Sequence, residues 1–110
     1  MPTALENQFH QAMIDIYLAA KRECNYNATY FIQMVDRLGG VETARRLLAS
    51  NAPQAGFTVL WECGRLDLSV EAHVLKSEFS SLFNAEERHI SRSRLAEYGY
   101  PDQKGDNLNE

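Results

Sequence analysis

The sequence predicts an all-α protein, built as a compact, irregular bundle of about six helices. Two observations carry this prediction. Apolar residues recur at three- and four-residue steps, and no segment alternates apolar and polar residues as a half-buried strand does. We expect residues 1–100 to form a single helical domain. The polar, turn-rich stretch 101–110 is expected to be a disordered tail.

The first helix is predicted to begin after Thr3, because Thr3 and Glu6 match the spacing of a capping box. The apolar periodicity then continues to Cys24, which corresponds to about six helical turns. The apolar positions are Leu5, Phe9, Ala12, Met13, Ile16, Tyr17 and Ala20. A helix of this length is expected to be the main support of the bundle.

Turn-forming residues divide the next part of the chain. Asn27 is a predicted N-cap for a second helix, and Gly39-Gly40 is predicted to end that helix through a left-handed turn. A third, short helix is expected to start at once with Val41. The stretch 51–56 is rich in turn formers and is predicted to be a loop.

The stretch 56–75 contains the only Trp and is predicted to fill the core between the flanking helices. We expect Phe57, Leu60 and Trp61 to be buried there, because only core packing would remove such large apolar surfaces from water. Gly64 is predicted to separate two short helices within this stretch, and Ser69 to cap the second.

The remaining helices follow from further capping signals. Ser77 is a predicted cap for one or two turns that bury the aromatic residues after it. Asn84 and Glu87 match a second capping box, and this box is expected to start a last helix that runs through Tyr98.

The composition is that of an ordinary globular protein, with 45% hydrophobic and 24% charged residues. The net charge of −4 is a mild argument against a nucleic-acid-binding module. No apolar run reaches the roughly 18 residues of a membrane span, so none is expected. The N-terminal stretch 1–6 has neither the basic start nor the apolar block of a secretory signal. Cys24 and Cys63 have no neighbouring cysteine, so we predict two reduced thiols and a cytoplasmic location.

Charged residues interrupt the apolar stretch 56–75, and they are the first candidates for a site. Arg65, Asp67 and Glu71, beside Trp61, are interpreted as a structural or interaction cluster in which the charges pair locally. An enzyme centred on Arg65, Asp67 and Glu71 is a weaker alternative. No nucleophile and no phosphate-binding loop accompanies these residues, so no catalytic residue is assigned.

No metal or cofactor is expected from the sequence. The histidines His10, His73 and His89 are far apart, and neither cysteine stands at a zinc-ligand spacing from another ligand. His73 lies in an apolar segment, where a hydrogen-bonded, half-buried histidine is the more common arrangement.

Five arginines form the other candidate site. They are Arg45, Arg46, Arg88, Arg92 and Arg94. If the third helix packs beside the last, they could form one patch that neutralises phosphates of a nucleic acid. Glutamates are interleaved with them, which favours a solvated surface with ion pairs within each helix.

Several stretches together resemble a known group of proteins. They are Tyr-Phe-Ile-Gln-Met-Val (30–35), Gly-Gly-Val-Glu-Thr-Ala-Arg-Arg-Leu-Leu (39–48), Gly-Phe-Thr-Val-Leu-Trp-Glu (56–62), Gly-Arg-Leu-Asp-Leu-Ser-Val-Glu-Ala (64–72), Leu-Phe-Asn-Ala-Glu-Glu (82–87) and Arg-Leu-Ala-Glu-Tyr-Gly-Tyr (94–100). This set resembles a family of short bacterial helical proteins without an assigned activity. The resemblance implies a bacterial, cytoplasmic origin and carries over no functional residue.

The function expected from the sequence is therefore non-enzymatic. A small helical protein with many core-forming residues and no catalytic constellation is typical of a protein–protein interaction or regulatory module. Its expected partner is another protein or a second copy of the same chain, and not a membrane. A nucleic-acid-associated accessory protein that uses the arginine patch is the alternative.

Overall fold

The computed structural model describes residues 3–50 and 55–100, and every regular element in these ranges is a helix. The α-helices are α1 (Ala4–Cys24), α2 (Thr29–Leu38), α3 (Gly40–Ala49), α4 (Ala55–Glu62), α5 (Val70–Val74) and α6 (Ala85–Glu97). Two 3₁₀-helices, η1 (Leu66–Leu68) and η2 (Ser77–Leu82), flank α5. The all-α prediction is confirmed. The tail expected at 101–110 lies outside the described residues.

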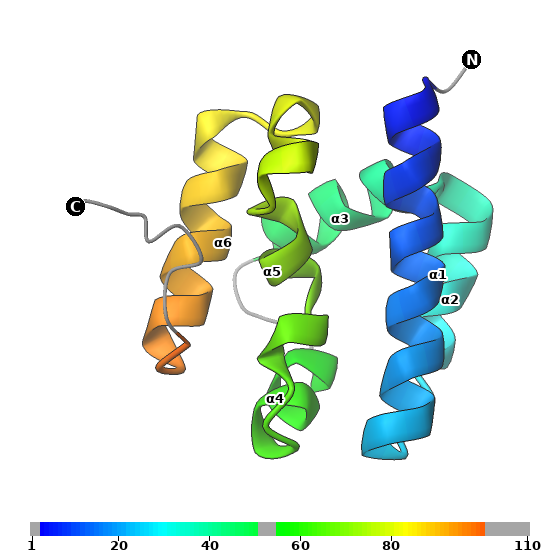
Figure 1. The fold of residues 1–110 in the computed structure, drawn as a ribbon, viewed down its shortest axis with the longest axis vertical. Coiled ribbons are helices and arrows are strands. Elements are labelled where there is room, and N and C mark those ends of the chain that lie inside the picture. The colour runs from blue at the N-terminus through cyan, green and yellow to red at the C-terminus, as the bar shows by residue number, and fades with distance from the viewer. Residues whose placement is uncertain (1–2, 51–54, 101–110) are drawn as a thin grey trace.

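The helices form a compact bundle in which α1 and α6 lie at opposite sides and α4 and α5 lie between them (Figure 1). Helix α3 crosses behind the central helices and packs on α1, α2, α5 and α6. Helix α1 packs against α2, α3, α4 and α5 and against both 3₁₀-helices. This agrees with its predicted role as the main support.

Both predicted capping boxes are present. At the start of α1, the Glu6 N–H donates to Thr3 Oγ1 at 3.1 Å and the Thr3 N–H donates to Glu6 Oε1 at 2.7 Å. At the start of α6, the Glu87 N–H donates to Asn84 Oδ1 at 2.8 Å, and the Asn84 N–H donates to Glu87 Oε1 at 2.9 Å. Each box satisfies two amides that a helix start leaves without a partner, which is why these two helix starts were predictable.

Two other predicted N-caps are wrong. Helix α2 starts after Ala28 without a side-chain cap, and Asn27 Oδ1 instead accepts a hydrogen bond from the Tyr17 hydroxyl at 2.9 Å. The 3₁₀-helix η2 starts after Lys76, and Ser77 caps nothing there. The expected loop 51–56 ends earlier than predicted, because Gly56 already belongs to α4. Residues 51–54 of this loop lie outside the described residues.

The two glycines between α2 and α3 have different roles. Gly39 ends α2 with a φ of 88°, a positive value that favours glycine, but its ψ of 159° differs from that of the left-handed turn predicted there. Gly40 lies against α1 instead, where an added Cβ would be 2.6 Å from the His10 Cα. The Gly40 N–H donates to His10 Nδ1 at 3.0 Å, so a side chain of α1 satisfies the first amide of α3. Only glycine permits this close approach of the two helices.

The core consists of two adjoining clusters of apolar side chains. In the first, Phe9 of α1 packs edge-to-face against Phe79 and Phe83, with ring centroids 5.0 and 5.1 Å apart. In the second, Phe57 and Leu60 of α4 are buried with residues of α1, η1, α5 and α6. The predicted burial of Phe57 and Leu60 is therefore confirmed.

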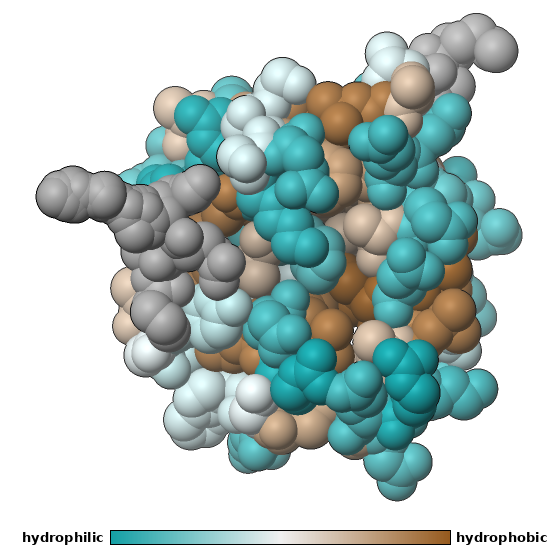
Figure 2. Space-filling model, viewed as in Figure 1, coloured by the Kyte–Doolittle hydropathy of each residue, from teal (hydrophilic) through white to brown (hydrophobic). Residues whose placement is uncertain are grey.

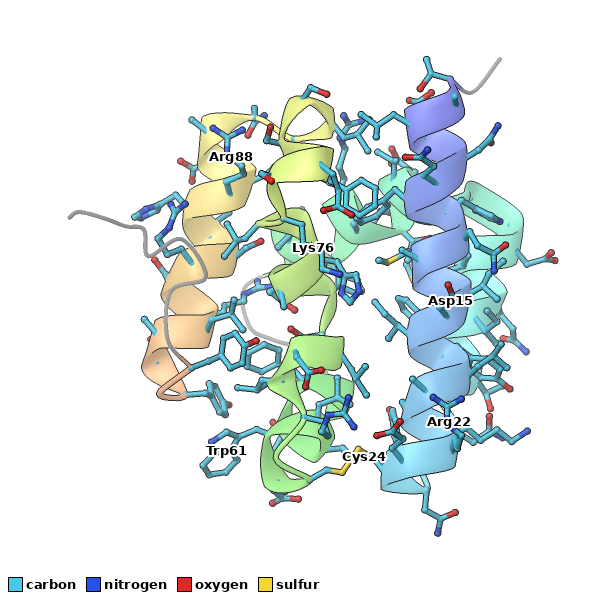
Figure 3. The ribbon with its side chains drawn as sticks, in the orientation of Figure 1. Asp15, Arg22, Cys24, Trp61, Lys76 and Arg88 are labelled. Carbon is cyan, nitrogen blue, oxygen red and sulfur yellow. A yellow bond between two sulfur atoms is a disulfide. The ribbon has the colours of Figure 1, made fainter. Side chains whose placement is uncertain are left out.

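The predicted burial of Trp61 is wrong. Its side chain is 47% exposed, and it lies at the surface where α4 approaches the end of α6 (Figure 3). Phe57 and Leu60 occupy the buried face of this short helix, and Trp61 is about 100° further round. The indole packs edge-to-face on the Tyr98 ring at 5.3 Å instead of entering the core.

No helix in the described part of the chain combines the length and the apolar character that crossing a membrane requires.

Candidate functional site

The main candidate site is an apolar pocket of about 410 Å³, which opens between α1, α2, α4 and the segment from η1 to the start of α5. Its walls include Tyr17 and Ala20 of α1, Phe31 and Met34 of α2, and Phe57 and Leu60 of α4. This volume lies within the range of about 300–1,000 Å³ that is usual for binding pockets, and a mostly apolar lining is typical of them.

Local sequence features shape the end of the pocket at the turn between α1 and α2. Asn25 adopts a left-handed conformation with a φ of 53°, which ends α1 and redirects the chain. The Tyr17–Asn27 hydrogen bond then ties this turn back to α1. The Tyr26 ring lies against Gly56, where a Cβ would be only 3.1 Å from the ring. A glycine at position 56 therefore lets α4 approach the turn closely.

The rim of the pocket carries an exposed aromatic side chain. Tyr30, in the first turn of α2, is 86% exposed and belongs to the pocket lining. Exposed tyrosines beside an apolar cavity are frequent in protein interfaces, since their rings supply a large contact area at low conformational cost.

The pocket presents no uncompensated charge among the described residues that line it. Its one ionisable carboxylate is Glu71, which is 5% exposed. Arg94 Nη1 of α6 donates to Glu71 Oε2 at 3.1 Å. Burial raises the pKa of Glu71, and the Arg94 guanidinium opposes that shift. The pocket is therefore suited to an uncharged apolar group.

Arg94 also joins three helices. Its Nη1 donates to the Leu47 carbonyl at 3.0 Å and its Nη2 to the Ser50 carbonyl at 2.7 Å, both at the C-terminal end of α3. The Leu47 carbonyl also accepts a hydrogen bond from the Ser50 hydroxyl at 2.8 Å, and a cation is favourable at this end of the helix dipole. One buried guanidinium therefore connects α3, α5 and α6.

The expected cluster of Arg65, Asp67 and Glu71 is divided in the structure. Arg65 Nε and Nη2 donate to the two carboxylate oxygens of Asp67 at 3.0 and 3.1 Å, and Arg65 also pairs with Glu23 of α1. This hydrogen-bonded arginine holds the pKa of Asp67 below its ordinary value. Glu71 pairs with Arg94 instead. The local pairing of Arg65 is as expected, but the three residues do not share one site.

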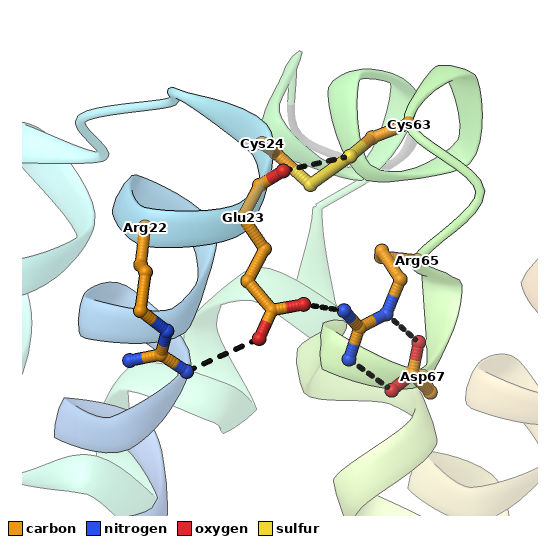
Figure 4. Close-up of a disulfide and its surroundings, with 6 residues drawn as sticks. All are labelled: Arg22, Glu23, Cys24, Cys63, Arg65 and Asp67. Carbon is orange, nitrogen blue, oxygen red and sulfur yellow. Dashed lines mark hydrogen bonds and ion pairs between the residues drawn. A yellow bond between two sulfur atoms is a disulfide. The ribbon is translucent and has the colours of Figure 1, made fainter.

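The two cysteines form a disulfide, so the prediction of two reduced thiols is wrong. The Cys24–Cys63 bond joins the last residue of α1 to the residue after α4, and the two Cα atoms are 5.9 Å apart (Figure 4). The Glu23–Arg65–Asp67 ion pairs lie beside it. The cysteines are 39 positions apart in sequence, and only the packing of α4 beside α1 brings them together.

The five candidate arginines do not form one free basic surface. Arg94 is 6% exposed and belongs to the buried network described above, which corrects its assignment to a surface patch. Arg45 pairs with Glu87 at 3.5 Å, and Arg46 pairs with Glu42 at 3.2 Å. Arg88 donates to the backbone carbonyls of Ser80 and Phe83 at 3.2 and 2.7 Å, which fastens α6 to the end of η2. Arg92 is exposed on α6 and also has a partner.

The described residues contain no group of three or more His, Cys, Asp or Glu side chains that could hold a metal ion. His10 Nδ1 accepts a hydrogen bond from the Gly40 N–H, and His89 is exposed on α6. His73 is buried in α5, and its Nδ1 lies 2.9 Å from the Ser69 carbonyl oxygen, to which it donates as the Nδ1–H tautomer.

His73 lines a second, smaller groove of about 340 Å³ between α1 and α5. Asp15 and Arg22 of α1 are on its other side, and both project towards the viewer in Figure 3. In the same orientation, hydrophobic atoms are visible in the seam between α1 and the central helices, with hydrophilic residues on both sides (Figure 2). This groove is more polar at its edges than the apolar pocket.

His73 is expected to make the protein less stable in mild acid. Burial lowers its pKa below the ordinary value of 6.5, although the bond to Ser69 acts in the opposite direction, as do the charges of Asp67 and Glu78. The unfolded chain therefore binds a proton at a higher pH than the folded protein does. The free energy of unfolding should fall as the pH drops below about 6.5, by at most about 1.4 kcal/mol per pH unit for this one group.

Urea titrations at about pH 7.5 and about pH 5.5 measure this dependence. His73→Gln should reduce the difference between the two pH values, whereas the matched variant of an exposed histidine, His89→Gln, should leave it unchanged. An equal pH dependence in the His73→Gln protein would show that other groups cause the effect.

At this level the fold defines a small all-α protein with an apolar pocket and one disulfide. Comparisons of the chain with protein families, with curated proteins and with solved structures find no match. The resemblance to a bacterial family therefore stays a prediction.

Sequence reasoning missed both the pocket and the Arg94–Glu71 pair. The walls of the pocket come from helices far apart in the sequence, and their apolar residues have the same periodicity as core residues. One signal was present for the disulfide: a chain with two cysteines has a single intramolecular pairing. No pattern in the sequence indicates that the two cysteines lie close together.

Proposed function

We propose that this protein is a non-enzymatic interaction module whose apolar pocket receives an uncharged apolar side chain of a partner protein. The observation that carries the proposal is the pocket of about 410 Å³ with Tyr30 exposed at its rim. An apolar lining together with the Glu71–Arg94 pair favours a neutral occupant over a phosphate or a carboxylate. A bacterial origin is still our expectation, but the Cys24–Cys63 disulfide removes the argument from reduced thiols to a cytoplasmic location.

Nucleic-acid binding is a weaker candidate than it was from the sequence. Arg45 and Arg46 are paired with glutamates, and Arg94 is buried. No pair of positions in the described part of the chain suggests acid–base catalysis, since Glu71 and Asp67 each interact with an arginine. We therefore base the functional test on the pocket.

Selection of peptides from a displayed random library on the disulfide-bonded protein tests the proposal. The selected peptides should share an aromatic or aliphatic anchor residue. Tyr30→Ser should weaken their binding by about tenfold, as truncation of a contact residue in an interface does. Thr29→Trp, which places a bulky side chain at the exposed mouth of the pocket, should abolish it.

Two matched variants control for effects on the fold. Gln33→Trp adds the same bulk on α2 outside the pocket lining, and Leu18→Ser removes an exposed hydrophobic side chain on α1. Both should bind the peptides normally and should be stable to within about 0.5 kcal/mol. Peptides that lack an apolar anchor, or that bind Thr29→Trp as tightly as the parent protein, would contradict the proposal. If the parent protein is a dimer and Thr29→Trp makes it monomeric, the occupant of the pocket is a second copy of this chain and not a different protein.

A further inference from the structure

The disulfide joins two walls of the apolar pocket. Ala20 of α1 lines the pocket one turn before Cys24, and Leu60 of α4 lines it just before Cys63. The bond therefore lies at the end of both walls and limits how far α4 can move from α1. Elsewhere, α4 packs on the bundle through Phe57 and Leu60 in the second apolar cluster, and through the ring contacts of Phe57 and Trp61 with Tyr98.

The two cysteine residues differ in their exposure. Cys63 is exposed, whereas Cys24 is only partly accessible. An external thiolate therefore reaches Cys63 Sγ more easily, which makes Cys24 the leaving group. Arg65 lies beside the disulfide (Figure 4), where Glu23 and Asp67 both pair with it and balance its charge.

We infer that the Cys24–Cys63 bond is a thiol-controlled latch on the apolar pocket, which holds the pocket in its binding form when oxidised and loosens it when reduced. This inference rests on the proposed function of the pocket. The co-reactant is a dithiol. One of its thiolates attacks Cys63 Sγ, the Cys24–Cys63 bond breaks, and Cys24 leaves as a thiolate that takes up a proton. The second thiol then attacks the mixed disulfide, so that Cys63 is also released as a thiol and the dithiol becomes a disulfide.

The ion pair between Glu23 and Arg65 has a defined role in the reduced protein. It joins the end of α1 to the segment after α4, next to the broken disulfide. Both side chains are about one-third exposed, so dissolved salt screens their attraction. Binding to the reduced protein should therefore depend on salt concentration, and binding to the oxidised protein should depend on it much less.

The test measures binding of N-phenylnaphthylamine, an uncharged apolar fluorophore, to the full-length protein. The oxidised protein should bind it about tenfold more tightly than protein reduced with dithiothreitol, a factor typical of coupling between two sites. Cys24→Ser/Cys63→Ser should bind like the reduced protein and should not respond to dithiothreitol. Arg65→Gln should weaken binding further in the reduced protein only. Thr29→Trp serves as the control for binding at the pocket.

The outcomes separate this inference from the proposed function. If the oxidised protein does not bind the fluorophore, or if Thr29→Trp binds it equally well, the pocket is not a binding site and the proposed function is wrong. Equal affinity in the oxidised and reduced proteins would overturn the latch alone. Loss of the helical circular dichroism signal on reduction would also overturn the latch, because the bond would then maintain the whole fold and not the pocket.

Discussion

Replacing Cys24 and Cys63 together with serine is expected to lower Tm by roughly 15 °C. The two cysteines are 39 positions apart, and closing a loop of that length stabilises a folded protein by about 4 kcal/mol through the entropy of the unfolded chain. Small domains have a total stability of about 5–15 kcal/mol, so the variant should still fold. Thermal unfolding followed by circular dichroism measures the change.

Reduced parent protein is the matched control for this variant. It should unfold at nearly the same temperature as Cys24→Ser/Cys63→Ser, and addition of a reductant should leave the variant unaffected. Mass measurement after alkylation tests the bond directly. Freshly prepared protein should take up no alkyl group until it is reduced. Two modified thiols without reductant, together with an unchanged Tm in the variant, would show that the bond does not form.

Arg94→Met is expected to destabilise the protein by about 3–5 kcal/mol, because it leaves the buried Glu71 carboxylate without its partner. The same substitution removes one hydrogen bond from each of the Leu47 and Ser50 carbonyls at the end of α3. Methionine fills much of the space of the arginine stem, so the loss should come from the unpaired polar groups and not from a cavity. Urea unfolding at neutral pH measures it.

The pH dependence of the Arg94→Met protein identifies the cause. Burial already raises the pKa of Glu71, and removal of the guanidinium should raise this pKa further. A buried carboxyl with a raised pKa in the folded state is least destabilising when it is protonated. The loss of unfolding free energy caused by Arg94→Met should therefore become smaller as the pH falls through that pKa.

Two further variants isolate the Glu71–Arg94 pair. Arg94→Met/Glu71→Gln should be more stable than Arg94→Met alone, since the second change removes the unpaired charge. Arg22→Met breaks an exposed pair with Glu23 and should change stability by at most about 1 kcal/mol. A loss of similar size in Arg22→Met and Arg94→Met would argue against a special role for burial.

The positions of several helices were predictable because the signals are local. The capping boxes at Thr3 and Asn84 need only residues three positions apart, and the turn at Gly39 needs only one residue that tolerates a positive φ. Ser69 likewise caps α5, because its Oγ accepts a hydrogen bond from the Ala72 N–H at 3.1 Å. Each of these features is decided within one helical turn, whatever the rest of the chain does.

The predictions that were wrong depended on contacts between distant segments. Asn27 is a suitable N-cap by residue type, but the Tyr17 hydroxyl of α1 donates to it instead. Trp61 is the largest apolar residue of α4, but Phe57 and Leu60 occupy the face of that helix that meets the core. Two isolated cysteines suggested free thiols, and their pairing depends on where α1 and α4 both end.

The sequence by itself determined that this protein is all-α, where α1, α5 and α6 begin, and that Phe57 and Leu60 belong to the core. Apolar periodicity and helix capping act over three or four residues, and the chain encodes them directly. Only the tertiary structure decided the pairing of Cys24 with Cys63, the burial of Arg94 beside Glu71, and the apolar pocket below Tyr30. Each of these joins residues more than 20 positions apart, and their proximity depends on how whole helices pack against one another.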